Sequence, residues 1–322
     1  MRRVNRSVMF VPINNPRFVE KAWTRGSDAI ILDLEDSVPM SEKEKARSLV
    51  QETIPKVAKS GASVFVRINK EFIKADLQAA IWPGISRVIL PKVQTAEDVQ
   101  MVDALITALE KERGIEVGRI EIFPLLESAL GIANSYAIAT ASPRVRVMPD
   151  GWGYDTALNI EIEMFAGFDQ YVYMREEPTL AAMAAGVEST GAPYVPGTTG
   201  KVGQKEEGEA LAQALRKLHV HEAIILHPAL VEPMVTGLVP LAEETKWAKN
   251  VVAVYEELEH EGEGVTEVKG KVVDIYEYQH ARELLCWAEA CSAMDRHKAR
   301  AVAKAQSEQT SADNSPGNTK QV

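Results

Sequence analysis

Cysteine is scarce in this chain of 322 residues, and long apolar runs are missing. The two cysteines, Cys286 and Cys291, lie five positions apart, without the spacing of metal ligands. We therefore expect neither a disulfide framework nor a zinc site, and a reduced cytoplasmic protein fits best. No apolar run reaches the roughly 20 residues that cross a bilayer, and none follows the basic start as in a secretory signal.

Positive charge is also in deficit. The chain has 36 basic and 46 acidic residues, a net charge of −10, which argues against nonspecific nucleic-acid binding. An anionic small ligand is not excluded, because local clusters decide that. The first 25 residues are locally basic, although a solvated face explains most of this cluster equally well: Arg2, Arg3, Arg6, Arg17, Lys21 and Arg25.

Short apolar segments without alternation recur along the chain and predict buried strands. They span residues 8–11, 29–34, 64–68, 88–90, 120–125, 145–148, 187–190 and 223–226. Helix-length segments separate them, and one begins with a capping-box pattern at Thr95 and Asp98. This alternation predicts a TIM (β/α)8 barrel. A doubly wound open sheet is the alternative, but no glycine-rich fingerprint follows the first strand.

The pattern changes after residue 230. Residues 242–258 read as an amphipathic helix, and a second helix is expected around 281–288. We therefore expect a barrel over 1–230 and a C-terminal helical extension over 231–300 that packs on a neighbouring subunit. Residues 301–322 lack an apolar pattern and predict a disordered tail.

Three carboxylates, Asp33, Glu35 and Asp36, follow the second predicted strand within four positions. At the carboxyl end of a buried parallel strand they would lie where such folds hold their active sites. Crowded carboxylates repel one another unless a cation or an arginine neutralises them. The segment therefore predicts a metal-dependent or arginine-assisted site, with capping of the next helix as the simpler interpretation.

Charged residues occupy other predicted strand ends as well. Glu127 and Asp155 could chelate Mg²⁺ and leave positions open for water and substrate. Arg67 could bind a carboxylate bidentately and offset charge on an oxyanion, or only neutralise the acids through an ion pair. Lys92, after the fourth strand, is a further candidate for substrate binding.

Seven segments in order resemble the citrate lyase β-subunit-like branch of the HpcH/HpaI aldolases, which includes malyl-CoA and citramalyl-CoA lyases. They span residues 10–22, 30–39, 66–69, 90–93, 126–132, 141–145 and 270–274. The resemblance covers roughly residues 7 to 290. It implies a Mg²⁺-dependent TIM barrel that cleaves or forms carbon–carbon bonds in hydroxyacyl thioesters, usually of coenzyme A. It also implies a homotrimer or hexamer whose C-terminal segment reaches a neighbour's site.

The resemblance also assigns roles to residues. Glu127 and Asp155 would be the metal ligands, and Arg67 would bind the carboxylate or oxyanion of the substrate. Glu35 and Asp36 would bond metal-bound water. Asp274 would act as acid or base at the α-carbon of the thioester, and Arg17 would lie near the phosphates of the thioester carrier.

The chain departs from the family pattern around the substrate pocket. One extra residue precedes Asp155, so Asp150 is a rival metal ligand, and the segments 186–193 and 226–229 differ from the usual motifs. The substrate is therefore left open among malyl-CoA, citramalyl-CoA and citryl-CoA. Three alternatives also stay open: a hydroxyacyl-CoA thioesterase, an aldolase for free 2-oxoacid adducts, and a non-catalytic CoA-binding subunit.

Overall fold

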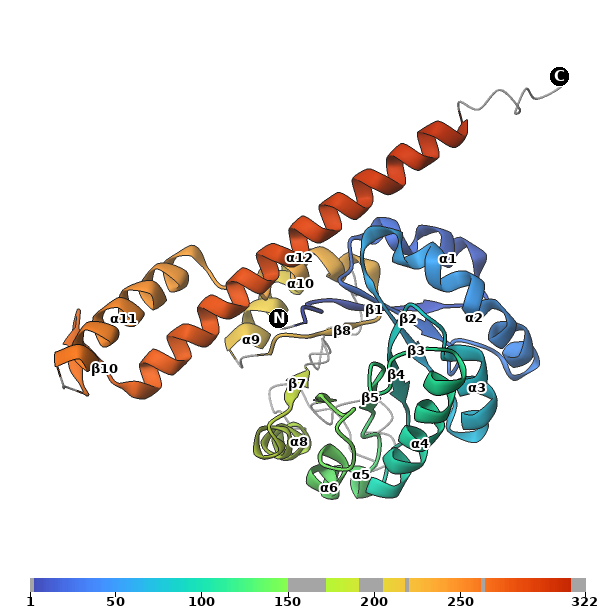
Figure 1. The fold of residues 1–322 in the computed structure, drawn as a ribbon, viewed down its shortest axis with the longest axis horizontal. Helices are drawn as coiled ribbons and strands as arrows, with labels where there is room; N and C mark the ends of the chain where they lie inside the picture. Colours follow the sequence, from blue (N-terminus) through green and yellow to red (C-terminus); the bar gives the residue numbers. More distant parts are fainter. Residues whose placement is uncertain (1–2, 150–171, 191–204, 218–219, 262–263, 314–322) are drawn as a thin grey trace.

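The computed structural model describes residues 3–149, 172–190, 205–217, 220–261 and 264–313. Six parallel strands form one curled sheet in the order β5-β4-β3-β2-β1-β8 (Figure 1). They are β1 (Val8–Pro12), β2 (Ala29–Asp33), β3 (Ser63–Arg67), β4 (Ile85–Leu90), β5 (Glu121–Pro124) and β8 (Ile224–Ile225). The strands β6 (Val147–Pro149) and β7 (Glu188–Thr190) pair separately.

Each strand overlaps one of the eight segments predicted from the sequence, and the parallel α/β fold is confirmed. A complete eight-stranded barrel is not, because within the described ranges β5 does not pair with β6, nor β7 with β8. The sheet is therefore a curled half-barrel to which a two-stranded piece is added.

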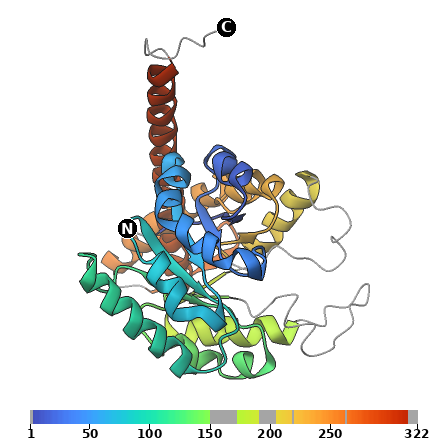
Figure 2. The same cartoon turned by 90° about the vertical axis from the view of Figure 1, so that its right-hand side faces the viewer.

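Helices cover the outer face of the sheet (Figures 1 and 2). They are α1 (Pro16–Ala22), α2 (Lys43–Val57), α3 (Ile73–Ala80), α4 (Ala96–Glu112), α5 (Ala129–Ala133), α6 (Ser135–Ala139), α8 (Val172–Ala185), α9 (Lys205–Lys217) and α10 (Val231–Gly237). The predicted capping box of Thr95 and Asp98 is present at the start of α4. Val102 and Ile106 on the apolar face of α4 are fully buried in the main core. Burial of each such side chain stabilises the fold by about 1.5–3 kcal/mol.

The concave face of the sheet is layered along the strand direction, because side chains two residues apart share a face. At the amino end, Arg87 is buried and donates from Nε to Oε2 of Glu121 at 3.0 Å. Next comes an apolar layer that includes Phe65 and Phe123. At the carboxyl end the same face of β3 presents Arg67. Charged groups thus close both ends of an apolar interior.

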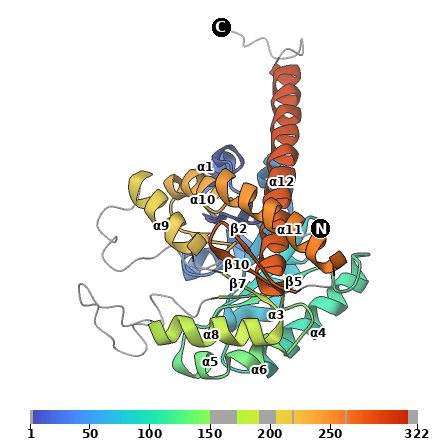
Figure 3. The same ribbon diagram turned by 90° about the vertical axis from the view of Figure 1, so that its left-hand side faces the viewer.

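The C-terminal extension is a pair of long helices, α11 (Ala242–Glu261) and α12 (Ile275–Asp313), lying side by side in Figures 1 and 3. A hairpin of β9 (Thr266–Val268) and β10 (Lys271–Val273) joins them. The turn residues Lys269 and Gly270 have φ of 52° and 78°, as tight two-residue hairpins require.

The helix α12 does not stop where the sequence analysis placed its end. It continues through 301–313, where a disordered tail was expected, and its far end extends beyond the body of the molecule (Figures 1, 2 and 3). The segment contains four alanines and two glutamines, which favour a helix even without an apolar stripe. The expectation of a tail relied on the missing stripe alone. Within the described ranges, no helix combines the length and apolarity needed to cross a membrane.

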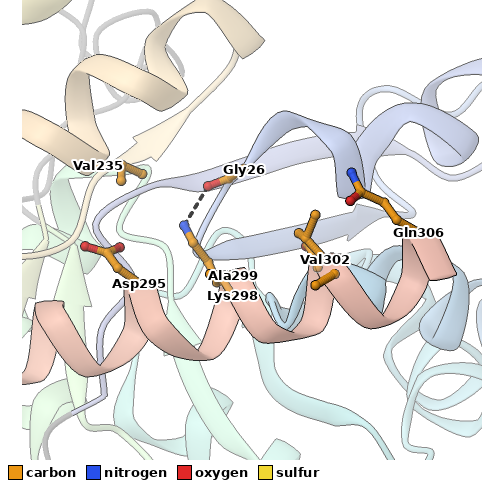
Figure 4. A pocket seen from close by; sticks show the side chains of 9 residues that line it. Gly26, Val235, Asp295, Lys298, Ala299, Val302 and Gln306 are labelled. Carbon is orange, nitrogen blue, oxygen red and sulfur yellow. Dashed lines mark hydrogen bonds between the residues drawn. The ribbon is translucent and has the colours of Figure 1, made fainter.

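A buried charge cluster fastens α12 to the sheet. Arg6 donates from Nε to Oδ2 of Asp28 at 2.7 Å, and both side chains are fully buried. Asp295 and Lys298 of α12 complete the cluster, and the Lys298 ammonium donates to the Gly26 carbonyl at 2.7 Å (Figure 4). Because Arg6 and Asp28 precede β1 and β2, α12 crosses the amino ends of the strands.

Replacing Asp28 should destabilise the protein far more than replacing Asp295. Asp28→Ala leaves the fully buried Arg6 without its main partner, a change expected to cost about 3–5 kcal/mol. The Asp295 side chain is 52% exposed, and Asp295→Ala should cost less than about 1 kcal/mol. Urea unfolding of both variants measures the difference. Equal losses would contradict the central place of Asp28 in the cluster.

Candidate active site

Arg67 is fixed by the acid that ends the neighbouring strand. Asp33 and Arg67 are register partners on β2 and β3, and Nε and Nη2 of Arg67 each donate to Asp33 at 2.7 Å. Burial alone would raise the pKa of Asp33, but the hydrogen bonds and charge of Arg67 outweigh it, and the pKa lies below its ordinary value. Asp33 is therefore the anchor of Arg67, a role that the sequence analysis did not assign to any particular acid.

The other two predicted acids also gather around the guanidinium. Nη1 of Arg67 lies 3.0 Å from Oε2 of Glu35 and 3.2 Å from Oδ2 of Asp36. Glu35 is buried, and this burial raises its pKa despite the charges of Arg67 and Lys92. Asp36 is 56% exposed and faces solvent. The ion pair that the sequence left open is thus present, and it includes all three acids.

Lys43 stabilises the backbone of the turn that carries Glu35 and Asp36. Its ammonium is buried and donates to the carbonyl oxygens of Leu34 and Glu35, each at 2.7 Å. These bonds hold the turn after β2 in the shape that turns Glu35 towards Arg67. The sequence analysis missed Lys43, since a single lysine in the first turn of a helix gives no signal of a buried contact.

Lys92 connects the acids to the predicted metal ligand. Its ammonium donates to Oε1 of Glu35 at 3.0 Å, and its backbone N–H donates to Oε2 of Glu127 at 3.0 Å. The bond to Glu35 raises the pKa of Lys92. Five predicted site residues therefore form one contact series: Asp36, Arg67, Glu35, Lys92 and Glu127.

A cavity of about 780 Å³ opens beside Arg67. Its lining includes the polar or charged Asp33, Asp36, Ser37 and Arg67 and the apolar Phe10, Phe18, Leu226 and Pro228. Lys21 and Arg25, two cations of the basic N-terminal cluster, also line it. Arg17, the cation that the resemblance favours, is exposed at the start of α1 and does not line the cavity. His227, after β8, is exposed and also lines the cavity.

The remaining predicted residues lie apart from this group. Asp274 caps α12, where its Oδ1 accepts from the backbone N–H groups of Tyr276 and Glu277 at 2.9 and 3.0 Å. Figure 1 places the β9–β10 hairpin beside it at the far end of the molecule from β2 and β3. Asp155 and its rival Asp150 fall outside the described residues. Across the described ranges, no three His, Cys, Asp or Glu side chains are grouped to hold a metal.

This arrangement, a carboxylate-bound arginine and a glutamate at the carboxyl ends of parallel strands, accompanies a clear family match. The model of the HpcH/HpaI aldolase/citrate lyase family matches residues 6–198, more than half of the chain. The chain belongs to this family. The matched range contains the whole contact series from Asp36 to Glu127.

Characterised relatives are similar over most of their length. The citrate lyase subunit beta of Leuconostoc mesenteroides subsp. cremoris is 33% identical over 276 residues, covering 84% of this chain and 89% of the relative. The L-malyl-CoA/beta-methylmalyl-CoA lyase of Rhodobacter capsulatus is 31% identical over 304 residues, covering 89% and 95%. The family member described here is accordingly a carbon–carbon lyase.

A solved structure supports the fold. The protein CitE from Mycobacterium tuberculosis, in complex with magnesium, acetoacetate and coenzyme A, aligns with a TM-score of 0.68. The alignment covers 90% of this chain and 100% of that one, at 21% sequence identity. At this identity the likeness supports the fold alone.

The pairing of Asp33 with Arg67 should make stability depend on pH in a defined direction. Because folding lowers the pKa of Asp33, its contribution is complete above the unfolded pKa of about 3.9 and is lost as pH falls through the lower folded value. Asp33→Asn should therefore cost about 3–5 kcal/mol at pH 7, and progressively less below about pH 4. Denaturant unfolding across pH 3–7 measures this.

The control is Asp36→Asn, which alters the exposed partner of the same arginine and should cost less than about 1 kcal/mol at any pH. A deficit in Asp33→Asn that stayed constant down to pH 3 would show that packing, not the carboxylate charge, carries the effect.

Proposed function

We propose that the protein is a Mg²⁺-dependent lyase for a 3-hydroxy-3-carboxyacyl-CoA thioester such as malyl-CoA, citramalyl-CoA or citryl-CoA. It cleaves the thioester into an acyl-CoA and a 2-oxoacid, or forms it from them. The observation that carries the proposal is the contact series from Arg67 to Glu127 beside a large cavity. The relatives named above, a citrate lyase subunit and a malyl-CoA lyase, supply the substrate class.

The residues fit a magnesium ion by their donor chemistry. Glu127 offers carboxylate oxygens at the strand ends, and Asp155, outside the described ranges, is the proposed second ligand. Carboxylate oxygens, the donor type that Mg²⁺ prefers, come together at these strand ends on Asp33, Glu35, Asp36 and Glu127. When bound, the ion would acidify the substrate hydroxyl and orient the hydroxyl and carboxylate.

The other residues of the site have separate roles. Arg67, held by its two hydrogen bonds to Asp33, keeps a fixed orientation towards the cavity and stabilises the negative charge that develops as the carbon–carbon bond breaks. Glu35 and Asp36 orient water at the site. A base takes up the proton of the substrate hydroxyl, and the breaking carbon–carbon bond leaves the 2-oxoacid and a thioester enolate. Asp274 then delivers a proton to the enolate carbon.

The cavity suits a CoA thioester on two counts. Its apolar lining residues, Phe10, Phe18 and Leu226, would contact the pantetheine arm, because such linear chains bury mostly carbon atoms. Lys21 and Arg25 would face phosphates, in place of or together with Arg17. Lys92, proposed from the sequence as a substrate-binding residue, is not among the residues that line the cavity; its ammonium is bonded to Glu35.

The geometry of Asp274 implies an oligomer within this proposal. Its hairpin is far from the carboxyl ends of β2 and β3 in its own chain (Figure 1), so it would act at the site of a neighbouring copy in a homotrimer or hexamer. Exposed apolar side chains surround it and would be covered by that copy: Val265, Val272, Ile275 and Tyr276. We also propose that each copy in this assembly forms a closed (β/α)8 barrel. For the protein as a whole, we propose a cytoplasmic location.

A direct test incubates the protein with Mg²⁺ and malyl-CoA, citramalyl-CoA or citryl-CoA, and follows products by mass spectrometry. We expect a 2-oxoacid and a shorter acyl-CoA, with turnover abolished by a chelator. Glu127→Gln should lower turnover by more than about 100-fold, since it removes a ligand charge. Glu116→Gln, on the exposed loop before β5, is the matched control.

Other outcomes would redirect the assignment. Free CoA with an intact hydroxy diacid would identify a thioesterase. Cleavage of only the free acids would identify a 2-oxoacid aldolase. Binding of CoA and metal without turnover of any compound would favour a non-catalytic subunit.

The proposed sharing of Asp274 between copies predicts complementation. Asp274→Asn and Glu127→Gln should each be inactive alone, yet co-assembled at equal amounts they should restore roughly a quarter of wild-type activity, because one site in four combines both intact residues. Co-expression with two tags and purification of mixed oligomers tests this. If the mixed oligomers stay inactive while each variant folds and assembles, Asp274 does not act across the interface.

A further inference from the structure

Lys92 has a backbone conformation that residues other than glycine rarely adopt. Its φ is 54°, one of two positive values among the described non-glycine residues. Such a conformation costs free energy and persists only where the surroundings enforce it. The other case, Lys269, lies in a hairpin turn, where positive φ is the usual geometry.

The flanking residues enforce the conformation of Lys92. Pro91 and Val93 are buried on either side of it. The backbone N–H of Val93 donates to the Leu125 carbonyl at 3.0 Å, and that of Leu125 donates to the Leu90 carbonyl at 2.8 Å. The end of β4 is therefore tied to the segment that leads to Glu127, and Lys92 has no freedom to relax.

Helix α5 packs closely against this turn at Gly131. A Cβ added to Gly131 would lie 2.4 Å from the carbonyl oxygen of Val93, too close for any side chain to fit without moving the backbone. The close approach of Gly131 thus keeps the Val93 peptide in place, next to the strained residue.

The strained conformation gives Lys92 two directions of contact. Its backbone N–H is aimed at Glu127, while its side chain extends to Glu35, which in turn lies against Arg67. Because φ is the rotation about the bond between N and Cα, it sets the direction of the Lys92 side chain and of the Val93 peptide relative to this N–H. The strained residue therefore links the proposed metal ligand Glu127 to Glu35, and Glu35 in turn contacts Arg67.

We propose that Lys92 is a positioning residue that orients Glu127 through its backbone N–H and Glu35 through its ammonium. This rests on the proposed function, in which Glu127 binds the metal ion and Arg67 the developing negative charge. In this proposal Lys92 sets the distance between Glu127 and Arg67. One substrate has to reach both the metal ion at Glu127 and the guanidinium of Arg67. The role differs from direct substrate contact, because the Lys92 ammonium is already bonded to Glu35.

Three substitutions separate the two contacts. Lys92→Gly keeps the N–H and accepts positive φ without strain, Lys92→Met keeps the length of the side chain without its charge, and Lys92→Ile resists positive φ. We expect Mg²⁺ affinity, measured by calorimetry, to be within about threefold of wild type for the glycine and methionine variants. The isoleucine variant should bind about 10–100-fold more weakly.

The ammonium is tested by turnover. Lys92→Met should lower kcat about 10–100-fold with KM for the acyl-CoA nearly unchanged, and Lys92→Arg should restore part of kcat. A residue that contacts substrate directly would instead raise KM. Equal metal affinity in the glycine and isoleucine variants, or a rise in KM alone for Lys92→Met, would overturn the positioning role.

A second variant alters the turn without touching a charged group. Gly131→Ala should displace the Val93 peptide and weaken Mg²⁺ binding about 10-fold, whereas Leu130→Ala, at a half-exposed position on the same helix, should leave it unchanged. Thermal unfolding confirms that each variant folds. Unchanged binding in Gly131→Ala would contradict the proposal even if the isoleucine variant failed to fold.

The same measurements distinguish a failure of the metal assignment from a failure of the positioning role. If wild type binds Mg²⁺ and Glu127→Gln does not, the metal assignment holds, and the Lys92 and Gly131 variants decide the positioning role alone. If wild type binds no Mg²⁺, or Glu127→Gln binds it normally, the metal assignment fails and the positioning of a metal ligand by Lys92 falls with it.

Discussion

The bidentate pair between Asp33 and Arg67 is the contact on which the rest of the site depends. It joins the ends of two adjacent strands, so the sheet itself sets the position of the guanidinium. With Nε and Nη2 held by Asp33, the Nη1 side is left to meet Glu35 and Asp36. The orientation of the arginine is thus fixed before any substrate arrives, which is how a site limits its reorganisation during reaction.

The interior of the curled sheet explains why these charges lie at one end. Each strand has room for only a few inward side chains, and the middle positions are apolar. Charged residues are confined to the ends, where they pair. At the amino end Arg87 is fully enclosed with Glu121 and Glu222, and this group has a structural role. At the carboxyl end, Arg67 lines the cavity, and Asp36 and Lys92 are exposed.

Much of this could be predicted from the sequence, because buried parallel strands are short apolar runs and their polar ends are visible in the chain. The strands and the gathering of Arg67, Glu35 and Asp36 followed from that pattern. The strain at Lys92 and the burial of Lys43 did not, since both depend on packing between distant segments. The sequence also did not show which cations of residues 16–25 reach the cavity: Arg17 and Lys21 lie on α1, Arg25 follows it, and only Lys21 and Arg25 line the cavity.

The attachment of α12 has a mechanical consequence. Besides the contacts near Lys298, the helix is attached at the buried Trp287, whose Nε1 donates to the Leu238 carbonyl at 2.9 Å. Asp274 lies 13 positions before Trp287, so roughly 20 Å of helix separates them at 1.5 Å per residue, and a tilt of about 5° would displace the far end by roughly 2 Å. Trp287 and the buried cluster of Arg6 and Asp28 therefore set the angular precision with which a distant carboxylate is aimed.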